Sequence, residues 1–256
     1  AKQLEQIKNG FPFLRLEGAA AIGKGIMSPD AEEVKKYEQV WDEYKKQGHR
    51  IVKFVPASGA ASRMFKNLFS FLSAEYDIPT TDFEKKFFAD IQKFAFYSSL
   101  NKKCEQNTGK DIPALMACKE YKQVVSNLLE KHGLNYGSLP KGLLLFHTYP
   151  DTFRTAMEEH LAEGAMYAKN NFGKVNIHFT VSPEHKALFE ELVKEKVSCY
   201  EDKFSVTYDI SFSVQKPSTD TIAVNLDNTP FRDKEGNLFF RPGGHGALIE
   251  NLNDMD

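Results

Sequence analysis

The feature that constrains the fold most is a short apolar run that leads into a loop of small residues. The run Ile51-Val52-Lys53-Phe54-Val55 predicts a buried β-strand. The small residues Ala57-Ser58-Gly59-Ala60-Ala61 follow it, and a second helix is expected to begin near Ser62. Because a strand, a small-residue loop and a helix in this order form one α/β unit, the segment predicts an α/β protein.

The rest of the chain continues this alternation around one long helical block. Residues 69–133 hold apolar side chains at helical spacing and no strand pattern, so we expect a helical insertion there, with a polar loop over 101–113. The strands expected after it are 175–181 and 204–214, and the expected helices are 152–169 and 183–196. This order favours one α/β domain over residues 1–256, with a mostly parallel sheet.

An amphipathic helix is expected before the first strand. Ser28 can cap it, Pro29 suits its first turn, and Gly48 follows as a stop signal. The apolar residues that recur at helical spacing, and are expected to form its buried stripe, are Val34, Tyr37, Val40, Trp41 and Tyr44.

Charge and cysteine content limit the function classes. The net charge is −2, from 33 Lys and Arg against 35 Asp and Glu, so we expect neither nucleic acid nor an anionic membrane as a partner. The three cysteines match no zinc spacing, and reduced thiols indicate a cytoplasmic protein. Residues 1–10 lack the apolar core of a signal peptide, and no apolar run approaches a membrane span in length.

Three glycine-containing segments suit phosphate chemistry. In 56–64, small side chains let backbone amides approach a phosphate and Arg63 adds a fork of donors, although an ordinary tight turn has the same pattern. Lys141 stands between a proline and a glycine, where it either points into the same crevice or lies exposed in a turn. In 241–246, three glycines flank His245 and allow close approach to a ring or ribose, or form a flexible turn.

Taken together, these segments resemble those of the sugar-nucleotide pyrophosphorylases. The similar segments, in the same order, are Gly59-Ala60-Ala61-Ser62-Arg63-Met64, Pro140-Lys141-Gly142 and Pro242-Gly243-Gly244-His245-Gly246. Two further segments look like pieces of the UDP-sugar pyrophosphorylase branch, namely Thr180-Val181-Ser182 and Gln215-Lys216-Pro217. The chain is also similar to an uncharacterised bacterial family described as a domain of unknown function.

The resemblance implies a Rossmann-like nucleotide-diphospho-sugar transferase fold. It also implies a nucleotidyltransferase that joins a nucleoside triphosphate, expected to be UTP, to a sugar 1-phosphate with Mg²⁺ and releases pyrophosphate. Arg63 would bind the leaving pyrophosphate, and Lys141 would hold the α-phosphate. The nucleotide-binding residues would be Ala57, Ser58, Gly59, Ala60, Ala61, Ser62, Gly244, His245 and Gly246.

Departures from that family keep other hypotheses open. Ala61 stands where the family has a glycine. The family's metal-binding acidic residue lies beyond the glycine–histidine loop, so we expect the N-terminal part of a longer protein, with the metal ligand outside this chain. Asp220 and Asp227-Asn228 are fallback ligands within it, although Asp-Asn also suits a turn. The alternatives are a non-catalytic module that binds a nucleotide or nucleotide sugar, and an α/β protein of unrelated function.

One further cluster lies on the helix expected over 152–169. Glu158, Glu159, His160 and Glu163 could bind a metal or act as acid and base, but a solvated helix face is the simpler interpretation.

Overall fold

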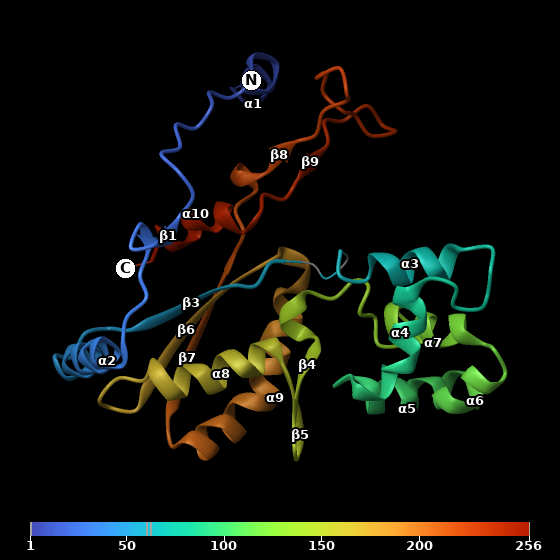
Figure 1. The fold of residues 1–256 in the computed structure, drawn as a ribbon, viewed down its shortest axis with the longest axis horizontal. Helices are drawn as coiled ribbons and strands as arrows, with labels where there is room; N and C mark the ends of the chain where they lie inside the picture. The colour runs from blue at the N-terminus through green and yellow to red at the C-terminus, as the bar shows by residue number, and fades with distance from the viewer. Residues whose placement is uncertain (1, 60, 62, 256) are drawn as a thin grey trace.

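A computed structural model of the chain describes residues 2–59, 61 and 63–255. Its main sheet has three parallel strands in the order β3-β6-β7, as Figure 1 shows. The strands are β3 (Val52–Pro56), β6 (Lys174–Val181) and β7 (Thr207–Val214). The prediction of an α/β protein is therefore confirmed at the level of a mixed chain with a small parallel sheet.

Alternation along β6 explains how this sheet is covered. Val175, Ile177 and Phe179 point to one face, where they are at most 1% exposed. The helices α8 (Ala156–Tyr167) and α9 (Lys186–Phe204) pack against this apolar face (Figure 1). Because all three strands are parallel, their carboxyl ends meet at one edge of the sheet.

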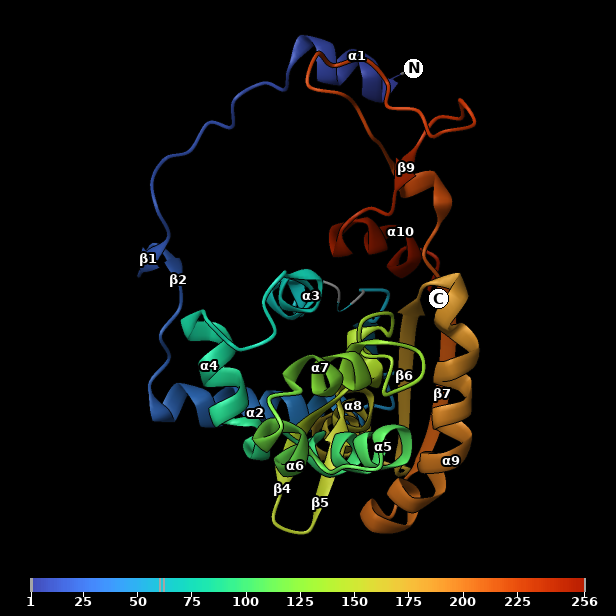
Figure 2. The same cartoon turned by 90° about the vertical axis from the view of Figure 1, so that its right-hand side faces the viewer.

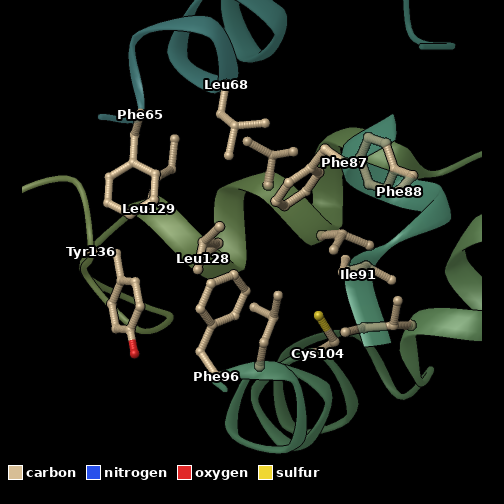
Figure 3. Packing of buried hydrophobic residues seen from close by; sticks show 14 of the residues in the cluster. Phe65, Leu68, Phe87, Phe88, Ile91, Phe96, Cys104, Leu128, Leu129 and Tyr136 are labelled. Atoms are coloured by element: carbon tan, nitrogen blue, oxygen red, sulfur yellow. The ribbon is translucent and has the colours of Figure 1, made fainter. Parts of the chain in front are cut away.

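Between β3 and β4, the described residues form helices and no strand. The α-helices are α3 (Lys66–Ser73), α4 (Asp82–Ala89), α5 (Tyr97–Thr108), α6 (Ile112–Ala117) and α7 (Tyr121–Leu129). They enclose a core of their own, in which Phe65, Leu68, Phe87 and Leu128 meet (Figure 3). This helical core and the sheet core share no buried residue among those described.

The polar loop predicted over 101–113 is wrong, because α5 occupies most of it. Leu100 and Cys104, one turn apart, are fully buried, and the polar residues between them lie on the outer face of the helix. Asn101 also accepts a hydrogen bond from the Ile112 amide at 2.8 Å, which fixes the start of the next helix.

The helix α2 (Ala31–Lys46) differs from expectation in two respects. Its cap is Asp30 instead of Ser28: the Asp30 carboxylate accepts hydrogen bonds from the Glu32 and Glu33 amides, both at 2.9 Å. The predicted buried stripe is exposed, since its five apolar side chains are between 36% and 59% exposed. None of the α2 residues is buried, although the Trp41 indole donates to the Tyr167 carbonyl at 2.9 Å.

Two hairpins lie outside the main sheet. The helix predicted over 152–169 begins late, because 152–155 form an antiparallel strand and Thr155 then caps α8. A second hairpin extends away from the sheet, and α1 (Lys2–Asn9) lies beside it (Figure 2), where Gln3 donates to the Asp220 carbonyl and accepts from the Ile222 amide. The remaining elements are β1 (Ala21–Ile22), β2 (Gly25–Ile26), β4 (Leu145–Tyr149), β5 (Thr152–Thr155), β8 (Thr221–Ile222), β9 (Phe240–Arg241) and α10 (Ile249–Leu252).

Within the described ranges, no helix combines the length and the apolar character needed to cross a membrane.

Candidate functional site

A cleft of about 990 Å³ opens at the carboxyl edge of the parallel sheet. Ala57, Ser182 and Gln215 line it, and these residues directly follow β3, β6 and β7. Ligands of α/β sheets bind at this edge because the strand ends leave backbone groups and loops free to face them. The position of the cleft therefore makes it the first candidate for a functional site.

The cleft brings together three segments that sequence reasoning selected. The predicted site residues that line it are Ala57, Ser58, Gly59, Arg63, Lys141, Gly244 and His245. Gly246 does not line it, since it lies inside the short 3-10 helix His245–Leu248. Ala60 and Ser62 lie outside the described residues. Two cations and two glycine loops from distant parts of the chain thus face one space.

Only part of the small-residue loop can donate amides to a ligand. The Ala57 amide donates to the Thr180 carbonyl at 2.8 Å, and the Ala61 amide lies 3.4 Å from the Leu139 carbonyl. Ala61 is also completely buried in the helical core and does not line the cleft, so in this structure its amide does not face the space that a nucleotide would occupy. In contrast, the amides of Ser58 and Gly59 have no acceptor among the described residues.

The loop and the lysine turn are tied to each other. The Lys141 amide donates to the Gly59 carbonyl at 3.2 Å. Gly142 lies against the buried ring of Phe189, where an added Cβ would come within 2.8 Å of two ring carbons. At Gly59 the same addition would meet no described atom within 4 Å. Gly142 is therefore required for packing, whereas Gly59 leaves open space beside the cleft.

Of the four lysine and arginine side chains that line the cleft, three have no carboxylate partner among the described residues. Lys53 is bound to Glu163, but no ion pair within the described residues involves Arg63, Lys141 or Arg241. Sequence reasoning did not select Arg241, although it begins the glycine segment that contains His245. Unpaired cations around a cleft create a positive potential that attracts an anion, and arginine suits phosphate oxygens in particular.

A buried amide holds the second glycine loop in place. Gln215 is 8% exposed, and its Nε2 donates to the Gly243 carbonyl at 2.9 Å. A Cβ at Gly243 would approach the Thr219 carbonyl oxygen at 2.8 Å, so only glycine fits there. Gln215 belongs to one of the segments that look like the UDP-sugar pyrophosphorylases, and in the structure it positions the second glycine loop.

The cluster on α8 is mostly engaged in structural contacts. Glu158 accepts hydrogen bonds from the amide and hydroxyl of Thr155 in a capping box. The Lys53 ammonium holds the pKa of Glu163 below its usual value. Burial, aided by the charge of Lys53, lowers the pKa of His160, whose Nδ1 lies 3.5 Å from Glu163 without hydrogen-bond geometry. His160 therefore faces the cleft as a neutral ring near pH 7.

Carboxylates are few at the cleft. Asp220 and Glu184 line it, whereas Asp227 binds the Thr229 hydroxyl in the distant hairpin turn, so the two fallback metal ligands are separated. The described part of the chain contains no group of three or more His, Cys, Asp or Glu side chains arranged to hold a metal ion.

Fold and site together define a mixed α/β protein with a cationic cleft at the carboxyl edge of a parallel sheet. The model of the family described as Domain of unknown function (DUF4301) matches residues 1–256, and the chain belongs to this family. Neither a curated protein nor a solved structure matches the chain.

Proposed function

We propose that the chain is a nucleotidyltransferase that joins a nucleoside triphosphate, UTP, to a sugar 1-phosphate. The observation that carries this proposal is the meeting of Arg63 and Lys141, neither paired with a carboxylate in the described residues, beside the Ser58 and Gly59 amides. The two cations come from segments 78 positions apart, so a shared cleft does not follow from local sequence. The parallel sheet beneath the cleft is compatible with a Rossmann-like nucleotidyltransferase fold.

In this proposal each segment has a separate task. Arg63 binds the β- and γ-phosphates through its fork of donors, and Lys141 neutralises charge at the α-phosphate. The amides of Ser58 and Gly59 approach phosphate oxygens across the open space at Gly59. Gly244 and His245, held by Gln215, contact the base or ribose.

The reaction needs no protein nucleophile. An oxygen of the sugar 1-phosphate attacks the α-phosphorus, the bond from the α-phosphorus to the bridging oxygen breaks, and pyrophosphate leaves. Arg63 stabilises the charge that develops on the leaving pyrophosphate. The protein contributes by holding the two substrates in line and by excluding other orientations.

In this proposal Mg²⁺ would be bound jointly by substrate phosphates and by carboxylates of the protein. The ion is commonly held by one or two carboxylates together with substrate phosphates, and Asp220 and Glu184 are the carboxylates that line the cleft. When bound, the ion would neutralise part of the triphosphate charge.

A specific observation favours a second candidate, a module that binds a nucleotide or nucleotide sugar without turnover. Because Ala61 is buried and its amide lies against the Leu139 carbonyl, the loop offers fewer donors than a full phosphate-binding loop. Fewer donors reduce stabilisation of the developing charge more than they reduce ground-state binding.

The test is pyrophosphate release from UTP with Mg²⁺ and a panel of sugar 1-phosphates. We expect release that depends on one sugar 1-phosphate and falls by about a hundredfold or more in Arg63→Ala, since loss of one charge-stabilising group commonly costs 10²–10³ in rate. Arg15→Ala, which removes an exposed arginine of the N-terminal segment, is the matched control and should keep full activity.

Two outcomes would contradict the proposal, the first for the activity and the second for the site. Tight nucleotide binding without release for any sugar phosphate would favour the module. Pyrophosphate release that is equal in the wild type and in Arg63→Ala would show that the cleft is not the site of the reaction.

A further inference from the structure

A second pocket lies on the helical part of the molecule, apart from the cleft. It has a volume of about 430 Å³, and its lining shares no residue with that of the cleft. Its phenylalanines come from the residue before α3, from α4, from the segment 94–96 and from β4, and they are Phe65, Phe83, Phe87, Phe94, Phe96 and Phe146. A pocket of this size is large enough for a small organic ligand.

The floor of the pocket is rigid and its walls are accessible. Phe65, Phe87 and Phe96 are members of the buried helical core (Figure 3). Phe94 stacks on Phe96 with ring centroids 5.0 Å apart and an interplanar angle of 6°. Phe83 remains 43% exposed. The Phe94 ring is therefore held by the core, and the exposed Phe83 ring leaves apolar surface free for a further ring or chain.

The rim of the pocket is cationic. Lys86 and Lys93 line it together with Asp90. Lys93 is paired with Asp90 at 2.6 Å, whereas Lys86 has no carboxylate partner among the described residues. The rim thus carries one uncompensated positive charge beside an apolar interior, which is complementary to a ligand with an apolar body and one acidic group.

We propose that this pocket binds an amphiphilic organic anion, with its ring system or chain among the phenylalanines and its acidic group at Lys86. Apolar surface on both partners supplies most of the binding free energy. The lysine supplies the orientation of the ligand and the preference for a negative charge.

The pocket and the cleft are connected through neighbouring residues. Arg63 faces the cleft and Met64 lines the pocket. Lys141 faces the cleft, and Leu145 lines the pocket four residues later. The proposed ligand therefore occupies a site that is separate from the nucleotide site and adjoins both segments that carry the cations.

The test is a fluorescence titration of the full chain with 8-anilinonaphthalene-1-sulfonate, which combines an apolar ring system with one sulfonate. We expect one saturable site per chain. Phe83→Asp places a charge on the apolar wall and should weaken binding by about tenfold or more, and Lys86→Glu should weaken it by about fivefold or more. N-phenyl-1-naphthylamine, which lacks the sulfonate, should bind at least about fivefold more weakly to the wild type.

Two control variants carry comparable charge changes outside the pocket, so they show whether a loss of binding is specific to the pocket. Lys85→Glu reverses a neighbouring charge of α4 that does not line the pocket, and Val40→Asp charges the exposed stripe of α2. Both should bind the probe within about twofold of the wild type. Binding that Phe83→Asp leaves unchanged, or that Val40→Asp weakens equally, would overturn the site. Equal affinity for the neutral compound would overturn the assignment of an anion.

Discussion

At the scale of single residues, the cleft depends on backbone geometry as much as on charge. The side chains of Arg63 and Lys141 reach the cleft because the segments that carry them are tied together, with the Lys141 amide bound to the Gly59 carbonyl. Because Gly142 has no side chain, the lysine turn can pack directly against the Phe189 ring. No described atom lies within 4 Å of the position that a Cβ of Gly59 would take. Two glycines that are equivalent as sequence signals therefore have different functions.

This difference leads to a prediction for two matched substitutions. Gly142→Ala should lower the free energy of unfolding by about 1–3 kcal/mol, because its Cβ meets a fully buried ring. Gly59→Ala should leave stability within about 0.5 kcal/mol of the wild type, as surface substitutions usually do. Urea unfolding followed by circular dichroism measures both.

The two glycine substitutions should also differ in their effect on UTP binding. Gly59→Ala fills the space that a phosphate would occupy, so it should weaken UTP binding although the protein remains stable. If Gly142→Ala were as stable as the wild type, the described contact between the lysine turn and the sheet core would be incorrect.

At the scale of elements, α2 shows how a strong local signal can leave the packing of a helix undecided. Its capping box is complete, with the Asp30 amide bound to the Glu33 carboxylate at 3.1 Å and the Glu33 amide bound to Asp30. Its apolar stripe is nevertheless exposed. Capping and periodicity are local properties that fix a helix, whereas burial depends on which other element reaches it.

We therefore expect Asp30→Ala to act locally. Loss of this cap should destabilise α2 by about 1 kcal/mol, and amides of its first turn should exchange with deuterium faster. The urea midpoint of the whole protein should not move, because α2 contributes no residue to either core. Ser28→Ala is the control and should change neither quantity. Faster exchange in Ser28→Ala alone would show that the cap has been misassigned.

The elements also show how far the sequence could predict the fold and the site. The strands β3, β6 and β7 were predictable because each is a compact apolar or alternating run. The helix α5 was not, since polar residues on its outer face hide the buried pair Leu100 and Cys104. The cations of the cleft could be selected from their glycine and proline neighbours. The loss of the Ala61 amide could not, because it depends on Leu139, a contact between distant segments.

At the scale of the whole molecule, the cleft residues lie where the chain passes from the sheet core to the helical core and back. Ala57 packs in the sheet core and Ala61 in the helical core, so the small-residue loop is anchored at both ends. The lysine turn is anchored in the same way, since Gly142 rests on Phe189 and Leu144 is buried in the helical core. The helical insertion thus fixes both segments that carry the cations.

In the proposed function, Arg63 and Lys141 face the same bound triphosphate. Calorimetric titration of UTP in the presence of Mg²⁺ tests it most directly, with wild type, Arg63→Ala, Lys141→Ala and the double variant. Each single variant should raise the dissociation constant by about tenfold or more, as expected for a lost hydrogen bond to a charged group.

The controls are Arg15→Ala and Lys131→Ala, which remove exposed cations that do not line the cleft and should change the constant by less than about twofold. The double variant should bind UTP more weakly than either single variant. Affinity equal to that of the wild type in Arg63→Ala or in Lys141→Ala would show that the two cations do not share a ligand, and would contradict the account.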